Sequence, residues 1–324
     1  MLKSHFATAV LLTAALLASV LLLIEAGLHA LLGNYGISKL WEHDPGDGRC
    51  IGLKPGAETD YTGWLFRIPP VHLAVNADGY RGPRRPKAKA DDTYRILLIG
   101  DSFAFGQAVT EPETISAQLE KTLGDCGGRR VEVLNFGVPG LNMEEVLDQY
   151  RRFARQWQHD LVLYLAFKND LEGPLCRAHR TFSIMDSATF QRLNRNVYTI
   201  RLLYVVFMMG ATATDASDPS MRERLRRTED GLVGQARLCG AKLGVIMLGD
   251  PLLKQFPEGK PWVPPVPMLD VSDLLDSPHI VRREGHLDGA GDRILAIEAA
   301  AWIQANFCEQ VIAGLEAAEK PVTD

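Results

Sequence analysis

Short apolar runs alternate with amphipathic stretches through most of the chain after residue 93. Runs that are apolar throughout predict buried strands, at Arg95–Ile99, Val131–Phe136, Leu161–Phe167 and Leu243–Leu248, with a weaker one at Val266–Asp270. Apolar residues at helical spacing predict helices between and after them, at Pro112–Leu123, from Met143, from Met221 to about Cys239, and from Gly289 to Phe307. Helix-start signals support these helices: Thr110 with Glu113 as a capping box, Asn142, and Asp288. Strands alternating with helices predict an α/β fold with a parallel sheet covered on both faces.

The N-terminal residues follow a different pattern. Ala7–Ile24 contains no charged residue, and apolar character resumes after Glu25 as far as Leu32. About 20 such residues span a bilayer as a helix, whereas the apolar part of a signal peptide is usually about 7–15 residues. We therefore predict a cytoplasmic stub over 1–6 and an uncleaved transmembrane anchor over 7–32, with a cleaved signal peptide as the alternative. Lys3 precedes the span, which favours a cytoplasmic N-terminus and a domain outside the inner membrane.

The rest of the chain divides around the alternating pattern. Residues 33–92 are rich in Gly, Pro and Asp and predict an extended connector, followed by a domain over 93–308 and a tail over 309–324. Residues 171–220 are mixed and have no predicted role. Within them the apolar piece Thr199–Met209 is too short to span a membrane, so we expect a buried helix or the wall of a cleft rather than a second membrane contact.

Composition narrows the functional classes. The net charge of −5 gives no electrostatic basis for binding nucleic acid. The five cysteines form no Cys-x-x-Cys pair, which argues against a zinc site. An exported domain could join some of them as disulfides, and the odd number leaves at least one unpaired, so the pairing stays open.

Polar residues follow three of the predicted strands. Gly100-Asp101-Ser102 follows the first, Asn135-Phe136-Gly137 with Gly140 the second, and Asn169-Asp170 the third. Because the carboxyl ends of parallel strands share one edge of a sheet, we expect these groups to converge. A serine nucleophile with backbone and side-chain N–H donors for an oxyanion is what acyl transfer requires. The donors predicted here are the N–H groups of Ser102 and Gly137 and the amide of Asn169.

A base is needed to activate the serine, and histidine is the usual one. Two of the eight histidines, His286 and His279, lie near the start of the last predicted helix. We favour His286, with Glu284 as the carboxylate that orients it and Asp276 as the alternative. A serine–histidine pair without a carboxylate is also possible.

These segments together resemble the SGNH (GDSL-like) hydrolases over roughly Tyr94 to Phe307. Gly100-Asp-Ser-Phe, Asn135-Phe-Gly137, Phe167-Lys-Asn169-Asp170 and Gly285-His286-Leu-Asp resemble the family's four blocks, and Asn76-Ala-Asp-Gly79-Tyr-Arg81-Gly is similar to the lead-in of membrane-anchored members. Two positions depart from the pattern: Phe167 stands where Gly is usual, and Arg283 stands where an Asp usually orients the histidine.

The resemblance implies a flavodoxin-like, three-layer hydrolase that needs no metal or organic cofactor. It implies a membrane-anchored serine esterase acting at Ser102 on small acyl esters, most plausibly O-acetyl groups of envelope or secreted glycans. Three alternatives remain: an O-acyltransferase using the same site, an inactive glycan-binding or assembly component, and a long-chain thioesterase or lipase with an apolar cleft near Leu202–Met209. The sequence does not determine the oligomeric state.

Overall fold

The structure is a computed structural model of the whole chain. It describes residues 2–33, 36–44, 50–63, 66–167, 196–212, 219–248, 265–281 and 284–308, together with residues 170, 189, 192 and 193. Most of the segment 171–220 that precedes the helix at 198, and the predicted tail 309–324, lie outside the described residues.

The described strands of the main sheet lie in the order β10-β9-β8-β5-β7-β6. Their bounds are β5 Thr93–Gly100, β6 Asp125–Cys126, β7 Arg129–Asn135, β8 Leu161–Phe167, β9 Lys242–Leu248 and β10 Met268–Asp270. All neighbouring pairs are parallel except the edge pair β6–β7, which is antiparallel. Taken in chain order, the parallel strands have the flavodoxin-like arrangement 2-1-3-4-5, which confirms the predicted fold class. The weak strand predicted from Val266 begins two residues later, at Met268.

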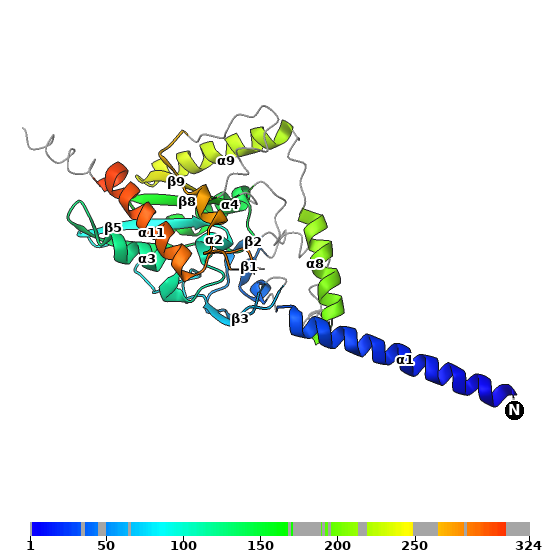
Figure 1. Cartoon of the computed structure of the whole chain (residues 1–324). Helices are drawn as coiled ribbons and strands as arrows, with labels where there is room; N and C mark the ends of the chain where they lie inside the picture. The colour runs from blue at the N-terminus through cyan, green and yellow to red at the C-terminus, as the bar shows by residue number, and fades with distance from the viewer. Residues whose placement is uncertain are drawn as a thin grey trace, which may run out of the picture.

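Helices cover both faces of this sheet (Figure 1). Alternate residues of β5 point to opposite faces, so that Ile96 and Leu98 join one core and Leu97 and Ile99 the other. The first core is closed by α3 and α11, and the second by α4 and α9. Their bounds are α3 Ile115–Leu123, α4 Met143–Arg152, α9 Pro219–Leu238 and α11 Gly289–Ile303.

The helix starts follow the predicted caps. Asn142 accepts a hydrogen bond from the Glu145 N–H at 3.1 Å, and Asp288 accepts from the N–H groups of Ala290 and Gly291. The capping box of Thr110 is present, but it begins a short 3₁₀ turn over Glu111–Glu113, and α3 itself starts at Ile115. The last helix likewise ends earlier than predicted, at Ile303, and continues as a π-helical turn over Gln304–Cys308.

The segment 33–92 is not an extended connector. Its described residues form two antiparallel pairs, β1–β2 and β3–β4, with bounds β1 Trp41–His43, β2 Cys50–Leu53, β3 Glu58–Tyr61 and β4 Val71–Ala74. Tyr61, Leu73 and Tyr80 are fully buried in the same core that α4 and α9 close. The prediction failed because the buried side chains of this segment are spaced by turns and short strands, which give no long periodic pattern.

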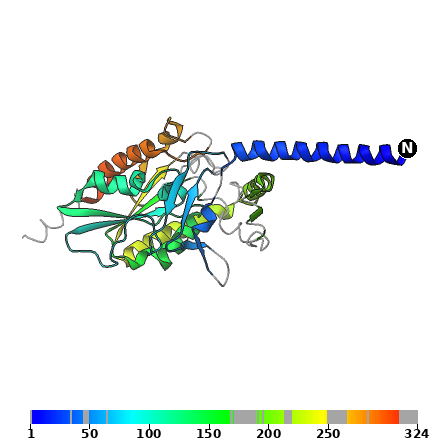
Figure 2. The same cartoon turned by 90° about the horizontal axis from the view of Figure 1, so that it is seen from below.

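The first helix, α1 (Leu2–Leu31), extends away from the sheet and its covering helices (Figure 2). Within it, Val10–Leu31 has a mean hydropathy of 2.3 and is long and apolar enough to cross a membrane. A signal sequence has the same properties, so the membrane anchor stays a prediction.

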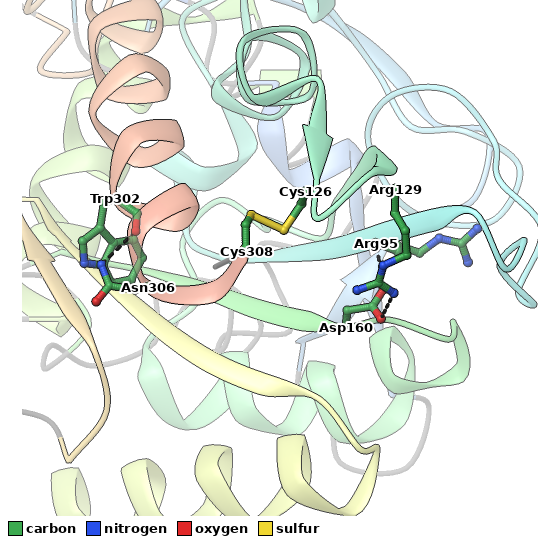
Figure 3. The surroundings of a disulfide bond; sticks show 7 residues. All are labelled: Arg95, Cys126, Arg129, Asp160, Trp302, Asn306 and Cys308. Atoms are coloured by element: carbon green, nitrogen blue, oxygen red, sulfur yellow. Dashed lines mark hydrogen bonds and ion pairs between the residues drawn. A yellow bond between two sulfur atoms is a disulfide. The ribbon is translucent and has the colours of Figure 1, made fainter. Parts of the chain in front are cut away.

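A disulfide joins Cys126, in the edge strand β6, to Cys308, at the end of the turn that follows α11 (Figure 3). It closes a loop with a sequence separation of 182 and fixes the C-terminal end of the last helix to the sheet edge. Cys50 is also disulfide-bonded, and Cys239 is free.

Candidate active site

Ser102 lies where β5 passes into a short helix, α2 (Ser102–Phe105). The Asp101 side chain caps this helix by accepting the Phe103 N–H at 2.9 Å. As the first helical residue, Ser102 has a backbone N–H with no acceptor within the helix. The side chain is therefore presented at the carboxyl edge of the sheet, as the sequence predicted.

His286 and Glu284 lie in the loop that leads into α11. His286 Nε2 is 2.7 Å from Ser102 Oγ, and His286 Nδ1 is 2.8 Å from each carboxylate oxygen of Glu284. The loop is held by a bridge between Ile280 and Leu287, and Gly285 has a φ of 90°. That positive φ, which glycine adopts without strain, lets the carboxylate turn back toward an imidazole only two residues away. The structure thus brings three predicted residues, separated by up to 184 positions, into one hydrogen-bonded line.

The surroundings set the protonation of this pair. Burial lowers the pKa of His286, but the charge and hydrogen bond of Glu284 outweigh that effect, so the pKa lies above its ordinary value of 6.5. For Glu284, burial acts to raise the pKa, but the charge of His286 and three hydrogen bonds lower it below 4.5. Glu284 is therefore ionised at neutral pH and stabilises a protonated imidazole.

Two further residues, which no sequence pattern predicted, extend this line beyond Glu284. The Tyr61 hydroxyl lies 2.5 Å from Glu284 Oε1, and Gln107 Nε2 donates to the Tyr61 oxygen at 2.7 Å. A carboxylate has no hydrogen, so the phenol donates to Glu284 and accepts from the Gln107 amide. Tyr61 comes from β3, in the segment predicted to be a connector. The alternation of exposed Glu58 and Asp60 with buried Thr59 and Tyr61 was the available signal for a strand with one buried face.

Arg81 from the same N-terminal segment supports the helix that carries Ser102. Its guanidinium donates to the carbonyl oxygens of Phe105, Gly106 and Val109 at 2.8, 2.5 and 2.7 Å. These carbonyls lie at and just beyond the C-terminal end of α2, where a helix leaves acceptors without partners. Burial lowers the pKa of Arg81 to about 10, which leaves it charged at neutral pH.

Of the predicted oxyanion donors Gly137 and Asn169, the structure describes only Gly137. The Gly137 N–H donates to the side-chain oxygen of Asn135 at 2.9 Å, so it is not free to bind a substrate oxygen. A Cβ at Gly137 would lie 2.3 Å from the Phe105 nitrogen, which shows that this glycine allows the loop to pack on α2. The assignment of Gly137 as an oxyanion donor is therefore wrong. Asn169 lies outside the described residues.

The alternative site residues point elsewhere. His279 Nδ1 lies 3.6 Å from Asp288, and its backbone belongs to the bridge that supports the loop of His286. Among the described residues, Asp276 has no hydrogen bond to either histidine. In the part of the chain that the structure describes, no group of three or more His, Cys, Asp or Glu side chains is arranged to hold a metal ion.

Aromatic rings form one wall of the site. The Phe103 ring lies 4.8 Å from the His286 ring and 4.3 Å from the Phe167 ring, measured between centroids. Phe167, which departs from the resembled motif, therefore packs behind Phe103 and helps to fix the ring that borders the imidazole. Asp170, next to this strand end, accepts hydrogen bonds from Tyr164 and the Phe167 N–H, each at 2.7 Å.

No protein-family model matches the chain, and no curated protein matches it. Solved structures of similar fold include a lipolytic protein assigned to the G-D-S-L family from Desulfitobacterium hafniense DCB-2, with 13% identity over 64% of this chain and 98% of that chain and a TM-score of 0.40. A lipase/acylhydrolase from Enterococcus faecalis has 17% identity over 65% of this chain and 96% of that chain, with a TM-score of 0.39. The psychrotrophic esterase EstA from Pseudoalteromonas sp. has 11% identity over 66% of this chain and 98% of that chain, with a TM-score of 0.42.

Proposed function

We propose that this protein is a membrane-anchored serine esterase of the SGNH type. The observation that carries the proposal is the line from Ser102 Oγ to His286 Nε2 at 2.7 Å and from His286 Nδ1 to Glu284 at 2.8 Å. A nucleophile, a base and an orienting carboxylate in this order form the arrangement that activates a serine for acyl transfer. The same geometry argues against an inactive binding component, which would have no need to retain it.

In the proposed mechanism, Ser102 Oγ attacks the ester carbonyl while His286 Nε2 takes the hydroxyl proton. The imidazolium that forms is stabilised by Glu284, which Tyr61 holds in turn. Collapse of the tetrahedral intermediate breaks the bond to the alcohol, which leaves with the proton from His286. Water then attacks the acyl-enzyme by the same steps and releases the acid.

The oxyanion formed in each step needs fixed donors. We assign the Ser102 N–H to this role and keep the prediction for the Asn169 amide. For the second backbone donor we substitute Gly140 for Gly137. The Pro139 carbonyl accepts a hydrogen bond from Trp41 Nε1 at 2.7 Å, and no peptide bond among the described residues is cis. In a trans peptide the N–H points opposite to the preceding C=O, so the Gly140 N–H points away from Trp41.

The proposed substrates are small acyl esters, and O-acetyl groups of envelope or secreted glycans remain the specific prediction. The Phe103 ring beside His286 supports an apolar acyl group next to the base. The disulfides at Cys126–Cys308 and Cys50 support a domain outside the cytoplasm, because such bonds persist in oxidising compartments. An acyltransferase would use the same residues, with a sugar hydroxyl replacing water in the second step.

Covalent labelling with a fluorophosphonate tests the proposal. The wild-type protein should be labelled, whereas Ser102→Ala and His286→Ala should not, and His279→Ala should be labelled like the wild type. Labelling that persists in Ser102→Ala would refute the assignment. Hydrolysis of p-nitrophenyl acetate against p-nitrophenyl decanoate then tests acyl size, and release of free acetate against its transfer to an added oligosaccharide distinguishes the esterase from the transferase.

A further inference from the structure

The helix α8 (Tyr198–Thr212) leaves an apolar face exposed. Of its described side chains, Tyr198 and Arg201 are buried, whereas Leu203 is 65% exposed and Val206 is 61% exposed. Together with exposed Thr199 they follow an i, i+4, i+7 spacing, so they share one face of the helix. This differs from the expectation of a buried helix at this position, and it leaves the exposed face to be explained.

The first turn of α8 is fixed to the C-terminal end of α1. The Glu25 carboxylate accepts from the N–H groups of Tyr198 and Thr199 and from the Thr199 hydroxyl, which caps the N-terminus of α8. Arg201 donates to the Gly33 carbonyl at 2.6 Å, so α8 is held both at Glu25 and at Gly33, two residues after the end of α1. The Tyr198 ring also packs edge-on against His29, with centroids 4.6 Å apart. These contacts fix the position of α8 relative to the predicted span.

The two views agree on the direction of α8. In Figure 1 it runs across the axis of α1, and in Figure 2 it is seen nearly end-on beside α1. In both views it lies on the side of the sheet toward which α1 extends. A helix that crosses the axis of a membrane span at the end of that span lies close to the plane of the membrane surface.

We propose that α8 is an interfacial helix whose face with Leu203 and Val206 lies in the headgroup–acyl boundary of the bilayer that α1 crosses. This inference rests on the proposed membrane anchor. The sequence from Leu202 to Thr214 contains no charged residue, and an apolar helix too short to span can bury one face in this boundary. The helix then holds the catalytic domain against the membrane in one orientation, so that esters close to the membrane surface reach Ser102.

The test uses the full chain reconstituted in vesicles of phosphatidylethanolamine and phosphatidylglycerol, with and without brominated acyl chains. The measured quantity is the tryptophan emission of Leu203→Trp minus that of the wild type. This difference should fall by about half in vesicles with brominated lipid, because interfacial helices lie about 5–10 Å into the boundary, where bromine reaches the indole. The matched control is Leu238→Trp, at the end of α9, where the native side chain is 79% exposed. Its added fluorescence should not change.

Two results would overturn the inference while leaving the anchor in place. Protein that resists carbonate extraction but shows no quenching of Leu203→Trp would place α8 in water. A blue-shifted emission of Leu203→Trp that brominated lipid does not quench would mean that protein, in the same chain or a second copy, covers the face. Protein that carbonate extracts would instead show that the anchor itself is wrong, and fluorophosphonate labelling would still report on the esterase independently.

Discussion

Replacing Tyr61 by phenylalanine removes one hydroxyl from the line behind His286. The Tyr61 ring and the Glu284 side chain are both fully buried, so water has no access to replace the lost bond. Glu284 would retain the bonds from the His286 ring and from the His286 N–H at 3.0 Å, but Oε1 would lose its donor on the far side. Gln107 Nε2 would lose its acceptor at the same time.

The magnitude follows from the type of bond. A hydrogen bond to a charged group contributes about 1.5–3 kcal/mol, and a buried donor left without a partner costs about 1–3 kcal/mol. Because the carboxylate stabilises the imidazolium that forms in the transition state, we expect kcat to fall by about 10- to 100-fold at about 1.4 kcal/mol per tenfold change. KM should stay close to the wild-type value, since Tyr61 contacts Glu284 rather than the substrate.

The assay is steady-state hydrolysis of p-nitrophenyl acetate, together with urea unfolding of the same preparations. Tyr150→Phe is the matched control, because its buried hydroxyl bonds His159 Nε2 at 2.9 Å in the same core but away from Ser102. It should lose stability and keep kcat. If Tyr61→Phe keeps the wild-type kcat, or if Tyr150→Phe loses as much kcat as Tyr61→Phe, the Tyr61 hydroxyl does not act on catalysis through Glu284.

Three other predictions concern the pKa of His286, the hydrogen bonds of Arg81 and the disulfide. Because the raised pKa of His286 must be exceeded before the ring is a free base, kcat/KM should fall as pH drops through a value above 6.5, and Glu284→Gln should move this limb to lower pH, as a pH–rate profile would show. Arg81→Met should cost at least about 2 kcal/mol in urea unfolding, because the buried Phe105 and Val109 carbonyls lose their guanidinium donor while the Gly106 carbonyl keeps the Val109 N–H at 3.3 Å, and a loss below about 1 kcal/mol would contradict that role. Replacing both Cys126 and Cys308 by alanine should cost about 3–5 kcal/mol of stability through the long loop that the disulfide closes, while fluorophosphonate labelling of the folded protein should persist.

Local sequence signals predicted much of the α/β domain. The apolar runs that became β5, β7, β8 and β9 are buried on both faces, which removes the alternation of a half-exposed strand and leaves a continuous pattern. The capping residues Asn142 and Asp288 act on N–H groups two or three residues away, so their role can be read from the sequence alone. Ser102 and His286 were predicted as site residues in the same way, because each follows or precedes an element with a clear local signature.

Such signals could not decide between alternative site residues. The sequence offered Glu284 and Asp276 as orienting carboxylates, and only the fold of the loop around Gly285 brings Glu284 to His286. Gly137 was predicted as an oxyanion donor, but in the structure its N–H donates to the side-chain oxygen of Asn135. Both outcomes depend on side-chain direction within a loop, which residue spacing does not fix.

The sequence by itself therefore determined the succession of strands and helices along the chain, their caps, and the positions of Ser102 and His286 at their ends, because those features depend on neighbours a few residues apart. Only the tertiary structure decided that Tyr61 and Arg81, from a segment with no periodic pattern, complete and support the site. Tyr61 and Glu284 are 223 positions apart, and their hydrogen bond exists only after the N-terminal hairpins pack on the sheet. Burial then gives that contact its strength, since a donor and a carboxylate removed from water must satisfy each other.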